Sequence, residues 1–192
     1  MALTLDQIKK LVEGHGLRYF LDPSRATFVI AGKGQFGSYQ FLILHEHDGQ
    51  FLQFRTYNYL YCPATHPHLS AVLKALADTN FRRRLVKYGW DERDGEIIAY
   101  VDQWLVDGTL TQLQFSQVLN HFWTGVDMSY ARLQATMAIG KDPGDKDIEA
   151  MMQEAAQNPQ TSSATGLAAL IAKLRDKFTA SKDGKTPDIT EV

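Results

Sequence analysis

The fold is decided by residues 26–61, which read ATFVIAGKGQFGSYQFLILHEHDGQFLQFRTYNYLY. Aromatic and β-branched residues gather in three segments, 26–31, 38–45 and 51–61, as is typical of β-strands. The residues between the segments, 32–37 and 47–50, are rich in glycine and polar side chains, as turns are. Segments joined by such short turns pair antiparallel, so this stretch predicts three antiparallel strands.

The third segment carries apolar side chains on both of its faces. One parity contains Phe51, Gln53, Arg55, Tyr57, Tyr59 and Tyr61, and the other contains Leu52, Phe54, Thr56, Asn58 and Leu60. Neither set is cleanly polar. A sheet of this kind usually has helices on one face and a binding partner on the other.

Helical spacing flanks the three strands. Thr4 and Gln7 have the spacing of a capping box, which begins a short helix that ends near Gly14 and Gly16. Pro67 predicts the start of a second helix, capped by Thr65 or His66 and ending near residues 79–80.

Residues 81–90 and 96–104 predict a further hairpin around the charged turn 91–95, in which Asp94-Gly95 favours a tight turn. A long helix then begins at Thr109 or Thr111 and continues to about Ile139. We therefore predict an α+β domain over residues 1–140. It has an antiparallel sheet of about five strands, in the order helix, three strands, helix, two strands, helix.

The composition changes after Gly140, so residues 141–192 are predicted to form a C-terminal extension. Short helices are expected at 147–157 and 167–178, separated by a polar linker at 158–166. Residues 181–192 are polar and charged, which predicts a flexible end.

The overall composition bounds the function classes. The formal net charge is -2 and the pI is about 6.3, whereas a nucleic-acid-binding domain is expected to be strongly basic. No apolar run approaches the length of a membrane-spanning helix, and the first residues lack the apolar core of a signal peptide. The single cysteine, Cys62, fits a reducing compartment. We expect a soluble cytoplasmic protein that binds neither nucleic acid nor membrane.

Residues 32–37, GKGQFG, match the G-x-G-x-x-G pattern of nucleotide-binding loops. The dinucleotide-binding version requires a helix directly after the loop, but residues 38–44 are predicted as a strand. The protein-kinase version requires a lysine on a nearby strand, and none occurs between Lys33 and Lys74. A glycine-rich hairpin turn is the preferred interpretation.

The soft metal ligands His45, His47, Cys62, His66 and His68 form the one cluster that could bind zinc. Their spacing is not a common zinc pattern, and His66 and His68 flank a helix start. Turn and capping roles are preferred. A small-ligand or metal-binding domain that uses this group or the loop Gly32–Gly37 remains the alternative function. No cofactor is predicted.

Two charged clusters are also explained without chemistry. Asp91, Glu92 and Asp94 lie at a predicted hairpin tip, where solvated carboxylates are normal. The basic run 82–84 falls on a predicted edge strand, where charge prevents pairing with other chains. Cys62 has no basic neighbour in sequence to activate it. No catalytic residue is predicted, and the chain is expected not to be an enzyme.

Aromatic residues on or beside the predicted strands are too many for one thin sheet to bury. The candidate protein-binding residues are Tyr57, Tyr59, Tyr61, Tyr88, Trp90, Tyr100 and Trp104. Helices of so small a domain cover only one face of the sheet, so part of this set should meet a partner.

The order of elements resembles the type III secretion chaperone-like fold, and in particular the YbjN-type family. The resemblance rests on FLQFR at 51–55, VKYGW at 86–90, EIIAYV at 96–101, LTQLQF at 110–115 and VDMSY at 126–130, and covers about residues 1–138. It implies a homodimer or a surface that binds another protein, since secretion chaperones of this fold hold an extended segment of a client and YbjN-type proteins are described as regulators. A non-enzymatic chaperone-like or regulatory protein-binding module is therefore the expected function.

Overall fold

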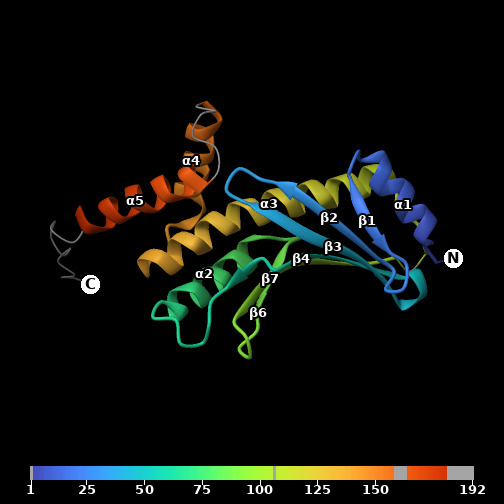
Figure 1. Ribbon diagram of the computed structural model, residues 1–192, viewed down its shortest axis with the longest axis horizontal. Coiled ribbons are helices and arrows are strands. Elements are labelled where there is room, and N and C mark those ends of the chain that lie inside the picture. The colour runs from blue at the N-terminus through green and yellow to red at the C-terminus, as the bar shows by residue number, and fades with distance from the viewer. Residues whose placement is uncertain (1, 106, 158–163, 181–192) are drawn as a thin grey trace, which may run out of the picture.

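The computed structural model of this chain describes residues 2–105, 107–157 and 164–180. The helices are α1 (Leu5–Gly14), α2 (Leu69–Arg82), α3 (Gln112–Ile139), α4 (Gly144–Gln157) and α5 (Ala164–Ala180), with a short 3-10 turn η1 (His47–Gly49). The strands are β1 (Tyr19–Asp22), β2 (Thr27–Lys33), β3 (Ser38–Glu46), β4 (Phe51–Tyr57), β5 (Leu60–Tyr61), β6 (Lys87–Trp90) and β7 (Glu96–Trp104). The predicted α+β class is confirmed (Figure 1).

All seven strands form one antiparallel sheet. Strands β1, β2, β3, β4 and β7 lie side by side in that order. Arg55 of β4 and Lys87 of β6 both pair with Tyr100 of β7, so β4 and β6 flank β7 on opposite sides. β5 lies on the same side of β7 as β4 and continues its line, because Leu60 pairs with Ile97 of β7. The outermost strands of the sheet are therefore β1 and β6, and β6 covers only residues 97–100 of β7.

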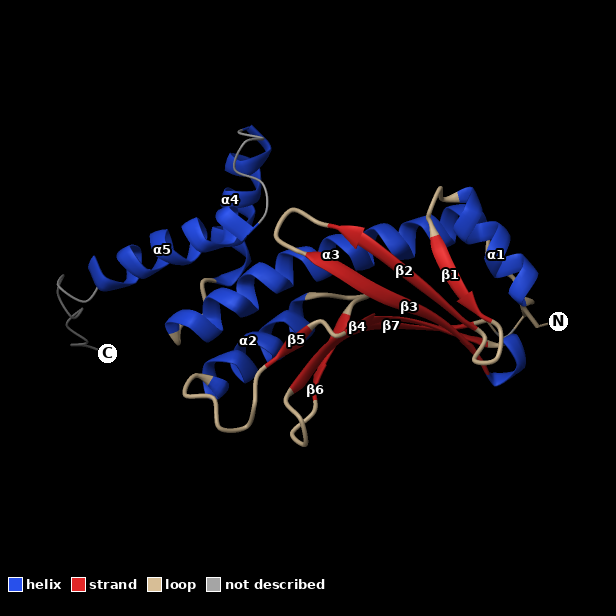
Figure 2. Ribbon diagram, viewed as in Figure 1, coloured by secondary structure: helices blue, strands red, loops and turns tan. Residues whose placement is uncertain are grey.

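The helices cover one face of this sheet, which we call the inner face (Figure 2). Side chains of alternate strand positions, among them Phe28, Phe41, Phe54 and Val101, are at most 1% exposed there. They pack against Phe115 and other buried positions of α3, which runs along the sheet. The hydrophobic core thus lies between the sheet and α3, with α1 and α2 closing its two ends.

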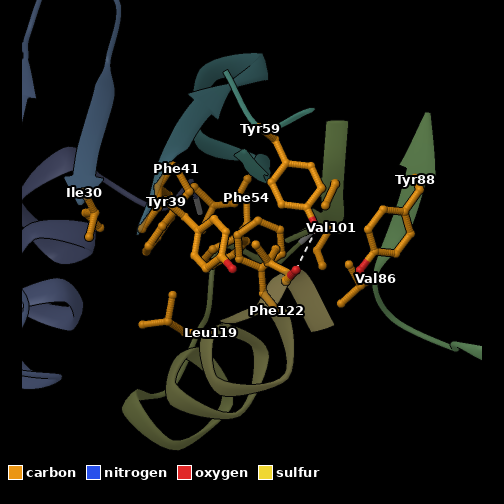
Figure 3. Close-up of a cluster of buried hydrophobic side chains, with 14 of the residues drawn as sticks. Ile30, Tyr39, Phe41, Phe54, Tyr59, Val86, Tyr88, Val101, Leu119 and Phe122 are labelled. Carbon is orange, nitrogen blue, oxygen red and sulfur yellow. Dashed lines mark hydrogen bonds between the residues drawn. The ribbon is translucent and has the colours of Figure 1, made fainter. Parts of the chain in front are cut away.

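Three tyrosines fasten the sheet to a single turn of α3. The hydroxyl of Tyr88 donates to the carbonyl of Gly125 at 2.8 Å, and that of Tyr59 donates to the carbonyl of Val126 at 2.6 Å. Tyr39 donates to the carboxylate of Asp127 at 2.5 Å. Figure 3 shows the three rings pointing toward the helix, Tyr39 from β3, Tyr88 from β6 and Tyr59 from the short link between β4 and β5. A tyrosine buried in a core normally finds such a partner for its hydroxyl, so these bonds fix where α3 lies on the sheet.

Capping boxes begin two of the helices, and the sequence predicted the one at Thr4. The Thr4 side chain accepts from Gln7 N and the Gln7 side chain accepts from Thr4 N at the start of α1, as predicted. Thr111, one of the two predicted positions, caps α3 in the same way together with Gln114. The cap of α2 is different: His68 holds the N-cap position without a side-chain hydrogen bond, so the prediction of Thr65 or His66 was wrong.

The sequence misplaced two strand segments. Strand β1 was not predicted, because its four residues include the polar Asp22 and show no clear alternation. Residues 81–90 were predicted as one strand, but α2 continues through Arg82 and β6 begins only at Lys87. Helix propensity of the arginines and the burial of the preceding apolar face of α2 extend the helix beyond the predicted end at 79–80.

The third predicted strand is interrupted. Asn58 has a left-handed backbone with φ of 50°, which ends β4 and starts β5 two residues later. As a result Tyr59 and Leu60 are both buried, and the strict alternation over residues 51–61 fails at this point. The interruption turns Tyr59 inward, whereas Leu60 and Tyr61 keep the faces that the parity of β4 predicts.

The described residues after Gly140 pack on the C-terminal half of α3. Gly140 itself ends that helix with φ of 76°. Ile148 of α4 and Leu170 and Leu174 of α5 are buried against Met128 and Ala135 of α3. The two helices were expected near these positions; residues 158–163 and 181–192, predicted as linker and flexible end, lie outside the described residues. The division into a domain at 1–140 and an extension at 141–192 stays a prediction.

Candidate protein-binding surface

The face of the sheet opposite α3, the outer face, carries apolar side chains across its whole width. The registers between strands place Phe20, Val29 and Leu42 in one transverse row, which continues through Arg55 and Tyr100. Among the described residues, no helix is packed on this face (Figure 2). Apolar groups in this number on an uncovered face are typical of a surface that meets another protein.

Four aromatic side chains of the outer face have large exposed fractions. These fractions are 68% for Phe20, 49% for Tyr57, 51% for Tyr61 and 57% for Trp104. Trp104 contacts the rings of Phe51 and His47, with centroids 4.9 and 5.3 Å away, which fix its position at one end of β7. Trp104 is thus held in place by two neighbouring rings while more than half of its surface stays open to solvent.

The charged groups of the outer face are arranged between these rings. Arg55 forms an ion pair with Glu96 at 3.5 Å, and the amide of Gln53 donates to Asp102 at 2.8 Å. The hydroxyl of Tyr61 donates to the Asn58 side chain at 3.0 Å. Partial burial, and next the nearby carboxylate of Glu96, raise the pKa of Tyr61, so its hydroxyl remains a neutral hydrogen-bond donor. The face combines apolar contact area with oriented polar groups, as protein interfaces do.

The seven predicted binding residues divide between the two faces. Tyr57, Tyr61, Tyr100 and Trp104 lie on the outer face. Tyr59 and Tyr88 are 7% and 5% exposed in the core, where a partner cannot reach them, so their assignment to a binding surface was wrong. Trp90 also faces inward and is half-buried, with its indole N–H donating to the carbonyl of Cys62 at 2.8 Å. The structure therefore reduces the set to four residues.

Phe20 is the exposed aromatic residue of the outer face that sequence reasoning missed. It lies on the unpredicted strand β1, and its apolar neighbours on the outer face come from β2 and β3. Within the sequence, its one indication is the aromatic and apolar run at residues 19–21, which is too short to distinguish a strand from a turn.

The histidine and cysteine group is not brought together. His45 pairs with Leu52, which pairs with Gln103 of β7, whereas Cys62 directly follows the residue paired with Glu96. Seven residues of an extended strand separate these positions by about 24 Å. Within the described residues, no group of three or more His, Cys, Asp or Glu side chains is placed to hold a metal ion. The shared site that the alternative hypothesis requires is therefore absent from this part of the chain.

Local structural contacts explain His45, Cys62, His66 and His68 instead. His45 Nε2 lies 2.7 Å from the carbonyl of Leu3, and Cys62 is a buried free thiol. The backbone N–H of His68 donates to Nδ1 of His66 at 3.1 Å, which closes the turn before α2. These contacts agree with the preferred interpretation of turn and packing roles.

The glycine-rich turn between β2 and β3 binds a carboxylate of its own chain. The backbone N–H groups of Gln35 and Phe36 donate to Asp127 of α3 at 2.7 and 3.0 Å. A Cβ atom at Gly34 would collide with the same carboxylate, and one at Gly32 would collide with Trp123. The glycines are therefore required for close approach to α3. A phosphate would meet donors already in use and a negative charge already present, which argues against the nucleotide interpretation.

The two predicted charged clusters form ion pairs within the chain. Arg93 forms an ion pair with Asp91 at 2.6 Å within the β6–β7 turn; the hydrogen bonds from Arg93 lower the pKa of Asp91 to about 2. Arg82 belongs to the last turn of α2, where it pairs with Asp78 at 2.7 Å. The interpretation of residues 82–84 as part of an edge strand was wrong, because Arg82 ends α2 and residues 83–84 lie in the loop before β6.

Two buried charges of α3 were also missed by sequence reasoning. Asp127 is 4% exposed and holds the glycine-rich turn, as described above. Arg132 is 2% exposed and pairs with Asp78 at 2.7 Å, Asp142 at 2.5 Å and Asp145 at 2.9 Å. It thereby links α2 and the start of α4 to α3. A charged residue inside the apolar stripe of a long helix is the sequence feature that could have indicated both.

The described helices include none with the length and apolar character needed to cross a membrane.

Comparisons with known proteins agree on the family. A sequence model described as "YbjN: Putative bacterial sensory transduction regulator" matches residues 4–135. A crystal structure of YbjN from E. coli, titled a "putative transcription regulator", superposes with a TM-score of 0.52 at 15% identity, covering 69% of this chain and 91% of that one. The HopA1-SchA chaperone-effector complex is similar at a TM-score of 0.44 and 11% identity, covering 61% and 84% of the respective chains.

A search of curated proteins found no significant match. The resemblance inferred from the order of elements is thus confirmed, and this chain belongs to the YbjN family.

Proposed function

We propose that this chain is a non-enzymatic regulatory or chaperone-like module that acts by binding another protein on the outer face of its sheet. The observation that carries the proposal is the asymmetry of the sheet: helices bury the inner face, while Tyr57, Tyr61 and Trp104 of the outer face are about half exposed. Burial of such rings against a partner would supply most of the binding free energy, since tyrosine and tryptophan dominate protein interfaces.

The family description supports the same class of role. A regulator of sensory transduction acts by contact with other macromolecules, and the net charge of -2 does not favour nucleic acid as the ligand. The partner is either a different protein or a second copy of this chain. We propose the cytoplasm as the location, in keeping with the one cysteine, which is a buried free thiol.

Site-specific photo-crosslinking tests the proposal. A photoreactive phenylalanine analogue at position 57 should give a defined protein adduct in cells that naturally produce this chain. The same analogue at position 81 is the control, because Phe81 is 91% exposed and lies on α2 away from the outer face. The adduct should disappear when Tyr61 is replaced by Ser. Equal labelling from positions 57 and 81, or none from 57, would contradict the proposal.

Light scattering after size-exclusion chromatography distinguishes between the two possible kinds of partner. If the partner is a second copy, the purified chain should have a mass of about twice 21.6 kDa, and Tyr57→Ser with Tyr61→Ser should return it to a monomer. If the partner is a different protein, the purified chain should be monomeric and the adduct at position 57 should contain a second polypeptide.

A further inference from the structure

One half of strand β7 has an open edge. β6 pairs with residues 97–100 of β7, and the other side of β7 is paired with β4 and β5 along its length. Residues 101–104 therefore have a neighbour on the β4 side, and among the described residues they have none on the β6 side. The edge of β6 itself is closed, because the Asn80 side chain bonds both N–H and C=O of Tyr88, at 2.8 and 2.9 Å.

These bonds identify which residues of β7 face the open side. Tyr88 directs its backbone groups away from β7, so its neighbours Lys87 and Gly89 direct theirs toward Tyr100 and Ile98. Even-numbered residues of β7 thus face β6. The N–H of Leu105 donates to Gln50 at 2.8 Å, which confirms that odd-numbered residues face the β4 side. It follows that Asp102 and Trp104 direct their backbone N–H and C=O groups to the open edge.

A groove lies directly beside this edge. It has a volume of about 610 Å³ and runs between the end of β7 and the first turns of α3. Its apolar lining includes Trp104, Leu110, Leu113 and Val118, and Leu113 is 70% exposed. An unpaired strand edge next to an apolar groove is the arrangement in which proteins bind a peptide as an added strand.

The path of an added strand follows from the position of β6. β6 crosses α3 near Gly125, whose carbonyl accepts from Tyr88. A strand that continues the line of β6 along β7 toward Trp104 passes over earlier turns of α3, at Gln117 and Leu113, which also line the groove. Its alternate side chains would point into the groove, and the others would lie on the outer face beside Asp102 and Trp104.

The acidic groups near this edge favour a ligand with basic side chains. Asp102 accepts its hydrogen bond from the uncharged Gln53, and Glu46 lies in the same transverse row as Trp104. Asp107 lies at the rim of the groove. A basic side chain directly across from Asp102 would form a cross-strand ion pair, and one over the Trp104 ring would form a cation–π contact.

We propose that the open edge of β7 at Asp102 and Trp104, together with the adjoining groove, binds an extended polypeptide segment in which apolar residues alternate with lysine or arginine. The apolar residues enter the groove against Leu113, and the basic residues lie on the outer face. This inference rests on the proposed function in that the ligand is a protein chain, but it assigns a second contact region with its own sequence preference.

Selection from a phage-displayed library of random decapeptides on the full chain tests the inference. The enriched peptides should alternate apolar residues with lysine or arginine. An enriched peptide, made synthetically, should shift the amide NMR signals of Asp102 and Trp104 and slow their hydrogen exchange. Enrichment without this alternation, or no enrichment, overturns the inference.

Matched variants localise the contact. Leu113→Asp should weaken binding of the peptide at least tenfold, whereas Phe81→Asp should leave it unchanged, since both residues are highly exposed and neither substitution disturbs the core. A copy of the peptide N-methylated at alternate backbone positions should not bind, because the ladder hydrogen bonds are lost. Equal affinity for the Leu113→Asp and Phe81→Asp variants contradicts the groove.

The test is separable from that of the outer face. The double variant Tyr57→Ser, Tyr61→Ser should keep its affinity for the decapeptide and lose the crosslinked adduct, and Leu113→Asp should do the reverse if the two regions bind separately. Loss of peptide binding in the tyrosine variant would mean that the peptide lies across the Tyr57 and Tyr61 rings, and would overturn the assignment to the edge of β7.

Discussion

The two faces of the sheet use the same residue types for opposite purposes. On the inner face, Tyr39, Tyr59 and Tyr88 are buried and donate hydrogen bonds to one turn of α3. On the outer face, Tyr57 and Tyr61 are about half exposed and contact no helix among the described residues. A tyrosine of the inner face contributes packing and a buried hydrogen bond, whereas one of the outer face keeps most of its apolar area for a partner.

This difference indicates where stability and binding reside. Buried aromatic groups with satisfied hydroxyls hold the fold, so their removal should lower the free energy of unfolding. Exposed groups contribute little to folding, so their removal should affect a partner alone. Substitutions that compare the two faces at matched positions test this separation.

The largest effect is expected from Phe54→Ala on β4. Phe54 is fully buried against Phe115 and Phe122, and its removal leaves a cavity that should lower the free energy of unfolding by about 3–5 kcal/mol. Tyr57→Ala, three residues along the same strand, should lower it by less than about 0.5 kcal/mol. Urea unfolding followed by circular dichroism measures both. Similar losses for the two variants would break the distinction between the faces.

A somewhat smaller loss is expected from Asp127→Ala. The substitution removes the acceptor of the N–H groups of Gln35 and Phe36 and of the Tyr39 hydroxyl. Unpaired buried donors should cost roughly 3 kcal/mol, reduced by any water that enters the site. The amide signals of Gln35 and Phe36 should lose their protection from hydrogen exchange. Retained protection would show that the carboxylate does not hold this turn.

An effect of about 1 kcal/mol is expected from Tyr88→Phe, which deletes one buried hydrogen bond to Gly125 and little packing. Burial raises the pKa of Tyr88 to about 12, in keeping with a neutral hydroxyl that donates within the core. Tyr61→Phe is the matched control on the outer face and should leave the unfolding midpoint unchanged. The comparison fails if Tyr61→Phe is the more damaging of the two.

The smallest effect concerns acid stability. The hydrogen bond from Arg132, and next that from Arg82, lower the pKa of Asp78 below 3.8. A carboxyl whose pKa is lowered by folding stabilises the protein above its unfolded pKa, and this contribution is lost as the pH falls through the folded pKa. Because Asp78 is one-third exposed, the loss should stay below about 1 kcal/mol.

The variant Asp78→Asn isolates this contribution. Below about pH 4 its unfolding free energy should approach that of the unmodified chain, while at pH 7 it should be lower. A difference between the two proteins that is independent of pH would exclude titration of Asp78 as the cause.

Much of the fold follows from local sequence features. The hairpin of β2 and β3, strand β7 from Glu96 to Trp104, and the capping box at Thr4 lie where the sequence predicts them, and α3 is capped at Thr111, one of its two predicted starts. Alternation, turn residues and capping spacings act over a few residues, so they can be recognised without knowledge of the rest of the chain. The short strand β1 and the end of α2 could not be recognised in this way, because packing against residues distant in sequence decides where they form.

The sequence predicted a surface rich in aromatic residues, but it identified only part of the residues that lie on it. The excess of aromatic residues over what one helical layer can bury is visible in the composition of the strands. The face that each ring occupies is not, because the left-handed backbone at Asn58 interrupts the alternation and sends Tyr59 into the core between the exposed Tyr57 and Tyr61. Tyr88 and Trp90 turn inward for a different reason: the register of β6 on β7 places them on the side of α2 and α3.

The sequence by itself thus determined the class of fold, most of its strands, and the surplus of aromatic residues that indicates a binding surface. Only the tertiary structure decided which rings remain exposed, and that α3 carries two buried charges, Asp127 and Arg132. The open half of β7 was decided there too. The physical reason is the range of the interactions involved: turns and caps are set by neighbours in sequence, whereas burial, register and buried ion pairs depend on residues that folding brings together.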